Sequence, residues 1–201
     1  MFSPASVRNG PHILKILKKI LPSAGTVLEV AAGSGQHAVM FAPEFPNLMW
    51  LPTDPADDKL TSIQAWMKEE PSDNILKPLK VDASETKWPV ESMKLNPPIS
   101  ALICINMIHI APWPAGQGLL AAAGRNLPKK GVFYLYGPFN EEGKFTAPSN
   151  QDFDVTLKRN NPEWGLRDLG VVVREAAMQG LNLQEVFNMP ANNKSVVFRK
   201  S

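Results

Sequence analysis

The stretch that decides the fold is LEVAAGSGQHA, residues 28–38. The run TVLEV (26–30) leads into it and has the β-branched, apolar composition of a buried strand. Gly33 and Gly35 then allow a sharp turn and a close approach of the backbone to a ligand. A helical pattern follows from about 35 to 42. Together these segments predict a strand, a glycine-rich turn and a helix, a unit typical of nucleotide-binding α/β proteins.

The rest of the chain repeats this alternation. Strand patterns lie at 48–54, 75–82, 99–108, 131–139, 182–189 and 195–200, and helical patterns at 11–21, 59–70, 116–127 and 166–180. Alternating strands and helices predict a parallel sheet with helices on both faces. Only the short segment PANNK joins the last two strands, so they should form an antiparallel hairpin. We therefore predict an α/β, Rossmann-like class I methyltransferase fold, whose seven-stranded, mostly parallel sheet has an antiparallel last strand.

Length and charge limit the classes of protein to consider. The 201 residues suit a single domain over 1–201, in which 1–24 would be an N-terminal helical lid segment. Lys and Arg outnumber Asp and Glu only 21 to 19, so no basic surface argues for a nucleic-acid partner. No apolar run reaches the roughly 20 residues that span a bilayer, which argues against a membrane partner.

Cysteine and histidine usage indicates neither disulfides nor metal. The one cysteine, Cys104, lies in an apolar run and is expected to be a buried hydrophobic residue. The three histidines lack metal-ligand spacing. The first ten residues lack the apolar core of a signal peptide, so we expect a cytoplasmic protein.

Acidic residues follow the predicted strands at the edge where a ligand would bind. In an open parallel sheet, ligands sit beyond the carboxyl ends of the strands. Asp54 ends the second strand, 21 residues after Gly33, and a carboxylate there suits the two hydroxyls of a ribose. Asp82 ends the third strand, next to Ala83, and suits an adenine amino group. Strand-end or helix-capping acids are the alternative explanation for both aspartates.

The acid at position 29 helps to decide between two candidate cofactors, NAD and S-adenosylmethionine. NAD favours the full G-x-G-x-x-G loop, and an acid just before that loop would repel its pyrophosphate. Here the third glycine is absent, since position 36 is Gln and position 38 is Ala. S-adenosylmethionine (SAM) carries an amino group and a sulfonium charge but no phosphate, so the acid suits it. The loop therefore favours SAM, with S-adenosylhomocysteine (SAH) as the product.

Several longer motifs resemble one known family. They are SVRNGPHIL, LEVAAGSGQHAVMFA, SIQAW, INMIHIAPW, YGPF, SNQDFD, WGLRDL and MPANNKSVVFRK. They resemble the DUF938 family, which includes the methyltransferase-like 26 proteins and is a branch of the class I SAM-dependent methyltransferases. The resemblance runs from about Ser3 to Lys200 and implies that fold and cofactor, without a general substrate. The family loop often reads Ser-Gly-Thr-Gly where this chain has Ala-Gly-Ser-Gly (32–35), and Ala31 replaces a first-position glycine.

Candidates for acceptor-facing residues follow the fourth and fifth strands. Methyl transfer needs mainly alignment of the acceptor, plus a base where the nucleophile carries a proton. In INMIHIAPW, Asn106 would hold the methionine part of SAM and His109 would accept a proton. Tyr136, in YGPF, would face the same cavity. A hydrogen-bonded structural histidine and a half-buried aromatic residue are the alternatives.

Three further motifs supply candidate binding residues. SNQDFD should lie in a loop, where Asn150 and Asp152 would bind the acceptor, with helix capping as the alternative. MPANNK offers Asn192 and Asn193, with an asparagine turn as the alternative. Arg8, just before the first helix, would bind the SAM carboxylate or an acidic acceptor, unless it is a plain surface arginine.

We therefore predict a SAM-dependent methyltransferase acting on an unidentified small-molecule acceptor. A noncatalytic protein that senses or scaffolds through bound SAM is the main alternative. An NAD-linked oxidoreductase is disfavoured by Glu29 and by the lack of a substrate domain. His109 and Tyr136 would be catalytic, and the residues predicted to bind the cofactor are Arg8, Glu29, Ala31, Gly33, Gly35, Asp54, Asp82, Ala83 and Asn106.

Overall fold

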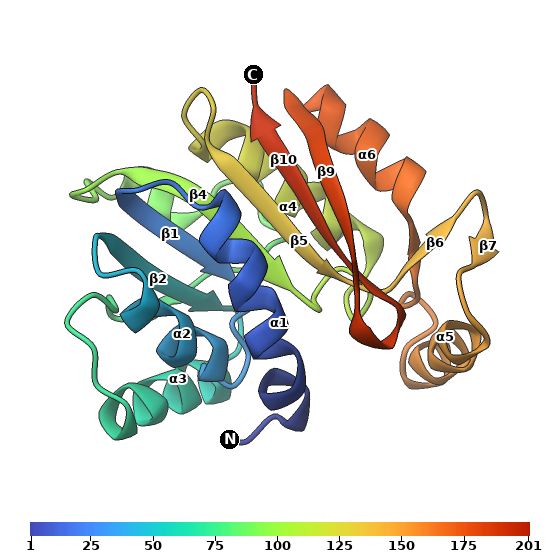
Figure 1. The fold of residues 1–201 in the computed structure, drawn as a ribbon, viewed down its shortest axis with the longest axis horizontal. Coiled ribbons are helices and arrows are strands. Elements are labelled where there is room, and N and C mark those ends of the chain that lie inside the picture. Colours follow the sequence, from blue (N-terminus) through green and yellow to red (C-terminus); the bar gives the residue numbers. More distant parts are fainter.

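The computed structural model describes residues 1–201 and is built on a seven-stranded sheet (Figure 1). The strand order is β3-β2-β1-β4-β5-β10-β9. β10 runs antiparallel to both of its neighbours, and every other pairing in this sheet is parallel, as predicted. The strands are β1 (Gly25–Val30), β2 (Leu48–Asp54), β3 (Leu79–Lys80), β4 (Ile99–Ile105), β5 (Val132–Gly137), β9 (Leu181–Met189) and β10 (Asn193–Lys200).

Helices cover both faces of the sheet, each over its own apolar core. On one face, α1 (Pro4–Ile20), α2 (Gln36–Phe41) and α3 (Asp57–Glu69) pack over a core centred on Trp50 and Tyr134. On the other, α4 (Trp113–Asn126) and α6 (Leu169–Met178) pack over a core centred on Leu102 and Phe133. The chain passes from β1 out to β3 and then returns to β4 on the far side of β1. This reversal makes the carboxyl ends of β1 and β4 the switch point of the sheet.

The first helix begins earlier than the predicted start at Pro11. Ser3 caps it by accepting a hydrogen bond from the Ser6 backbone N–H (3.3 Å), and Pro4 occupies the first turn, where no N–H is needed. Pro11 therefore lies inside the helix instead of starting it. The third strand is shorter than predicted, with Leu79–Lys80 as its ladder and an isolated bridge between Ile75 and Trp50, and Pro78, which lacks an N–H to donate, interrupts the pairing between them.

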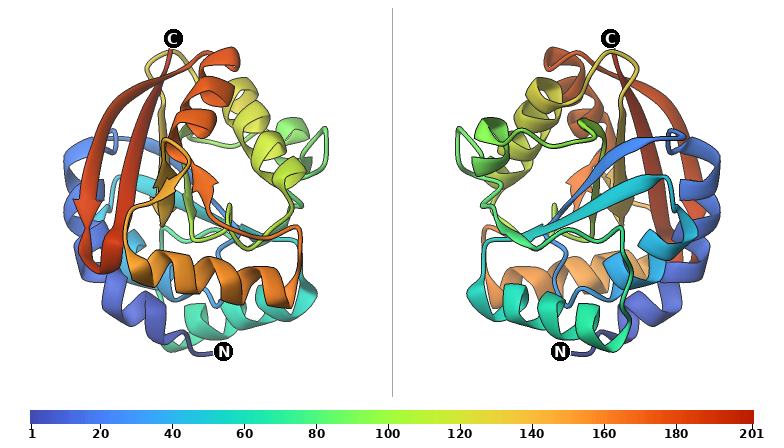
Figure 2. Two further views of the ribbon diagram at one scale, coloured as in Figure 1. Left: turned by 90° about the vertical axis from the view of Figure 1, so that its right-hand side faces the viewer. Right: turned by 90° about the vertical axis from the view of Figure 1, so that its left-hand side faces the viewer.

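A helix replaces the loop predicted around SNQDFD. Helix α5 (Pro148–Asn160) lies beyond the carboxyl edge of the sheet (Figure 2). Asn150 and Asp152 are therefore helical residues, and their predicted place in a loop is wrong. The helix has no apolar stripe by which it could be predicted from the sequence, since its only buried residues are Asn150, Asp154 and Leu157. Near it lies an unpredicted second sheet of β6 (Phe139–Glu141), β7 (Lys144–Phe145) and β8 (Arg167–Asp168).

The remaining elements are three short 3₁₀ helices, which span Ala42–Glu44, Pro89–Ser92 and Pro190–Asn192.

Two predictions about single residues are confirmed. Cys104 is free and buried, and burial raises the pKa of its thiol to about 12. The helical pattern predicted over 166–180 stops at Gly180, and this glycine follows α6 with a left-handed φ of 72°, as expected of a residue that closes a helix. A bilayer-crossing helix is absent, because none combines the necessary length with enough apolar character.

Candidate functional site

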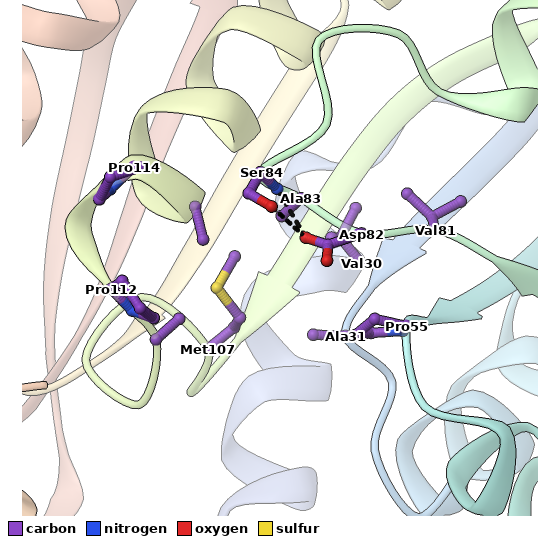
Figure 3. A pocket seen from close by; sticks show the side chains of 12 residues that line it. Val30, Ala31, Pro55, Val81, Asp82, Ala83, Ser84, Met107, Pro112 and Pro114 are labelled. Atoms are coloured by element: carbon purple, nitrogen blue, oxygen red, sulfur yellow. Dashed lines mark hydrogen bonds between the residues drawn. The ribbon is translucent and has the colours of Figure 1, made fainter. Parts of the chain in front are cut away.

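Three cavities adjoin one another along the carboxyl edge of the sheet. The outer cavity (about 300 Å³) lies between the ends of β1, β3 and β4, and Figure 3 shows its lining. The loop cavity (about 430 Å³) lies over the glycine-rich turn. The helix cavity (about 350 Å³) lies between α1 and the ends of β4 and β5. Ala31 and Met107 line both the outer and loop cavities, whereas Ala5 and Asn106 line both the loop and helix cavities.

The glycine-rich turn uses left-handed backbone at three positions, Ala31, Gly33 and Gly35, with φ of 56°, 59° and 90°. The two glycines serve different purposes. A Cβ added at Gly33 would meet no protein atom within 4 Å, so this position borders the open loop cavity. A Cβ at Gly35 would lie 2.7 Å from the Ile63 Cα, so the missing side chain lets α3 pack against the turn.

Ala31 adopts a left-handed φ of 56°, a conformation that favours glycine, so the turn forms with alanine at this position. A left-handed φ strains alanine by about 1–2 kcal/mol, and glycine is free of this strain. Because glycine also makes the unfolded chain more flexible, Ala31→Gly should raise the free energy of unfolding by a net 0.5–1 kcal/mol or so in urea denaturation. Ala32→Gly is the control, since Ala32 is buried and not left-handed, and it should destabilise the protein. A loss of stability in Ala31→Gly would contradict the assignment of strain.

Asp54 ties the turn to the end of β2. Its two carboxylate oxygens accept hydrogen bonds from the backbone N–H groups of Gly33 (3.0 Å) and Ala56 (3.1 Å). The residue is only 6% exposed and lines the loop cavity. Burial raises the pKa of Asp54, and the bonds from Ala56 and Gly33 partly offset that rise. Each oxygen can accept a second bond, so the carboxylate remains able to bind vicinal hydroxyls.

Glu29 is a buried acid on the same cavity. Trp50 donates its indole N–H to Glu29 Oε2 at 2.6 Å, which fixes the side chain. Burial raises the pKa of Glu29 to about 7; the Trp50 hydrogen bond opposes this rise, and the nearby Asp54 charge adds to it. Glu29 therefore titrates near neutral pH, and a cation entering the loop cavity would favour its ionised form.

The outer cavity combines apolar walls with one acid. Asp82 Oδ1 accepts bonds from the Ser84 N–H (2.8 Å) and hydroxyl (2.6 Å), which leaves Oδ2 free (Figure 3). Val30 and Met107 form part of the apolar lining, and Ala83 lies beside Asp82. A flat apolar ring with an amino group at its edge fits this arrangement.

The helix cavity brings together Arg8 and Tyr136, which are far apart in the sequence. Arg8 comes from α1, whereas Asn106 directly follows β4 and Tyr136 lies near the end of β5. Asn106 adopts a left-handed φ of 59°, a conformation that asparagine tolerates better than most residues. Asn193 reaches the same cavity from the β9–β10 turn. Arg8 thus lies away from the glycine-rich turn, on a different cavity from Asp54 and Glu29.

His109 lies behind this lining and is not part of it. Its side chain is 2% exposed, packs edge-on against Phe153 of α5, and leaves Nδ1 without a protein partner. A Cβ built on Gly137 would lie 3.1 Å from His109 Nδ1 and 3.7 Å from Asn106 Oδ1, so both side chains lie beside Gly137. Burial, followed by the Arg167 charge, lowers the pKa of His109 to about 4, so the imidazole is neutral at pH 7.

Two of the residues predicted to bind the acceptor, Asn150 and Asn192, are hydrogen-bonded to each other. Asn150 donates its side-chain amide to the Asn192 carbonyl (3.2 Å), and Asn192 donates to the Ser149 hydroxyl (3.0 Å). These bonds attach the β9–β10 turn to α5. Asn193 donates its amide within the turn, to the Pro190 and Ala191 carbonyls. Asp152 is exposed and lines none of the three cavities. Of the four residues, only Asn193 lines one of the three cavities of the site.

Sequence reasoning missed two residues near the site. His37 lines the loop cavity and hydrogen-bonds Asn9 Oδ1 through Nε2 (2.8 Å), and burial lowers the pKa of His37 to about 4. Arg167 donates to the carbonyls of Ile108, Ala111 and Glu163 and stacks over Trp113, so it fixes the segment after β4. Arg167 lies in the motif WGLRDL and contacts INMIHIAPW, but only the structure shows that these motifs touch.

Several solved structures with the same fold are described as methyltransferases. An O-methyltransferase family protein from Burkholderia thailandensis matches 98% of this chain with a TM-score of 0.81 at 12% identity. Human N-acetylserotonin methyltransferase, solved with SAM, matches 98% with 0.77 at 14%. A calicheamicin-biosynthesis methyltransferase, solved with SAH, matches 98% with 0.73 at 17%. This chain covers only 57%, 53% and 55% of those three chains, respectively.

These likenesses establish a Rossmann-like methyltransferase fold. A family model described as "Protein of unknown function (DUF938)" matches residues 1–200, almost the whole chain. The chain therefore belongs to the DUF938 family.

Proposed function

We propose that this protein is a SAM-dependent methyltransferase that acts on a small molecule. The observation that carries the proposal is the order of the three cavities along the switch point. Asp82 lies in the first, Asp54 and Glu29 lie in the second, and Asn106 and Tyr136 lie in the third. This order matches the sequence of groups in SAM, followed by an acceptor.

The lining fits each part of SAM chemically. Adenine would occupy the outer cavity, with its amino group donating to the free oxygen of Asp82 and Ala83 alongside. The ribose hydroxyls would donate to Asp54, next to the open face of Gly33. Glu29 would face the positively charged end, and Asn106, shared by the second and third cavities, would mark the methyl position. The solved structures with bound SAM or SAH support the same cofactor by analogy of fold.

The chain's own residues would then align an acceptor. SAM supplies a methyl group already activated by the sulfonium, so positioning is the main requirement. Tyr136 is 3% exposed and lines the helix cavity, and burial raises the pKa of its hydroxyl, which therefore stays protonated at pH 7. It would therefore act as a hydrogen-bond partner of the acceptor. His109 lies beside Gly137 outside the cavity lining, and its predicted role as a base stays a prediction. The first half of α1 walls two cavities, as the proposed lid would.

Isothermal titration with SAM, SAH and NAD tests this function. Binding of SAM and SAH without NAD is the expected result, whereas NAD binding alone would favour an oxidoreductase. Methylated product from a metabolite extract then separates an enzyme from a noncatalytic SAM-binding scaffold, which would bind SAM but release no SAH.

The affinity for SAM should rise about tenfold between roughly pH 6 and pH 8. The pKa of Glu29 is about 7, so its carboxylate is mostly protonated at the lower pH and mostly ionised at the higher one. Only the ionised form attracts a cation, so affinity must increase in that direction. Titration calorimetry across this range measures the effect. Glu29→Gln should bind more weakly and lose most of the slope, and an equal slope in both proteins would assign the titration to another group.

A further inference from the structure

The helix cavity has an unbalanced positive charge. Arg8 and His12 are four residues apart on α1 and therefore lie on the same side of that helix, above the cavity. The rest of the lining contains no aspartate or glutamate. The acids of the site line the other two cavities: Glu29 and Asp54 line the loop cavity, and Asp82 lines the outer cavity.

The guanidinium of Arg8 has no partner within the protein. None of the chain's ion pairs includes Arg8, and none of its side-chain hydrogen bonds does. Arg125 and Arg167, in contrast, bind a carboxylate and three carbonyls, respectively. Arg8 is also exposed, so it stands at the mouth of the cavity with its planar set of donors free.

Apart from Arg8 and His12, the residues that line the cavity are polar or small. Asn106 and Tyr136 offer an amide and a hydroxyl, and the apolar contribution comes from Ala5, Pro190 and Ala191. Asn106 also lines the loop cavity, so the inner end of the helix cavity is the end nearest the proposed methyl position. Its volume of about 350 Å³ suits a small metabolite.

We propose that the methyl acceptor is a small carboxylic acid whose carboxylate is bound by Arg8, with His12 beside it. This inference rests on the proposed methyltransferase function and names its substrate class. The carboxylate serves recognition at the mouth, and a separate nucleophile at the other end of the molecule points toward Asn106. A lone pair of that nucleophile forms the bond to the methyl carbon while the carbon–sulfur bond breaks and its electrons return to sulfur. The products are SAH and the methylated acid, and the proton of the nucleophile passes to solvent.

Methyl labelling of a fractionated metabolite extract tests the substrate class. A protein-free extract is separated by anion exchange, and each fraction is incubated with the protein and methyl-labelled SAM. Label should appear in products of the retained, anionic fraction. Label only from the unretained fraction would overturn the inference while leaving the methyltransferase function intact. No label from either fraction would refute the function itself, and the inference with it.

Variants of Arg8 make the second half of the test. Arg8→Gln should raise the amount of the anionic fraction needed for half-maximal labelling at least tenfold, without changing SAM affinity in calorimetry. For Arg8→Lys, the amount needed for half-maximal labelling should lie between those of the wild type and Arg8→Gln, because lysine keeps the positive charge but lacks the planar, two-pronged donors of a guanidinium. Lys15→Gln is the matched control, an exposed cation on the same helix outside the cavity, and should behave as wild type. Unchanged labelling by Arg8→Gln, or an equal loss of SAM affinity, would overturn the assignment.

Discussion

Asp54→Ala should weaken SAM binding at least a hundredfold and destabilise the free protein by about 2–3 kcal/mol. The first effect follows because the carboxylate would accept two ribose hydroxyls, and charge-assisted hydrogen bonds contribute about 1.5 kcal/mol or more each. The second follows because the same carboxylate already holds the N–H groups of Gly33 and Ala56 at the base of the turn. Calorimetry with SAH and urea denaturation measure the two losses separately.

Two further variants separate the effect of Asp54 on ribose binding from the effect of its hydrogen bonds with the Gly33 and Ala56 N–H groups on stability. Asp54→Asn keeps one acceptor oxygen, so stability should fall less than affinity. Asp58→Ala is the matched control, because Asp58 is a neighbouring acid whose side chain is 60% exposed and whose contact with Lys59 is long, at 3.9 Å. It should leave both quantities unchanged. An Asp54→Ala protein of normal SAM affinity would move the ribose contact to another residue.

The fold was predictable from sequence wherever burial determines composition. The strands predicted at 26–30 and 48–54 match β1 and β2 almost residue for residue, because central strands of a parallel sheet are apolar on both faces. Helix α5 escaped prediction for the opposite reason. It lies beyond the edge of the sheet, and Leu157 is its only buried apolar residue, so no periodicity of 3.6 residues marks it.

The position of a candidate-site residue was predictable from the sequence only where the strands of the sheet determine that position. Asp54 and Asp82 come to one edge because the carboxyl ends of parallel strands do. His109 follows the same rule in sequence, but the left-handed backbone at Asn106 and the bonds of Arg167 turn the segment so that its ring is buried. Side-chain direction after a strand depends on such turns, which neither composition nor spacing reveals.

Replacing each of the turn's two glycines by alanine should have different effects on stability and on SAM affinity. Gly35→Ala should destabilise the protein by about 3–5 kcal/mol, since the left-handed backbone strains alanine and its Cβ would lie 2.7 Å from the Ile63 Cα of α3. Gly33→Ala should lose only about 1–2 kcal/mol, because its Cβ meets no protein atom. That Cβ would project into the loop cavity, so SAM should bind more than tenfold more weakly to the folded variant.

Gly143 supplies the matched control for Gly33. It has a left-handed φ of 73° and open space around its missing Cβ, but it lies in the β6–β7 turn outside the three cavities. Gly143→Ala should therefore match Gly33→Ala in urea denaturation and match the wild type in calorimetry with SAM. If both variants bound SAM normally, the cofactor would not approach the backbone at Gly33. If Gly33→Ala alone lost binding, the loss would come from the occupied space and not from backbone strain, which the two positions share.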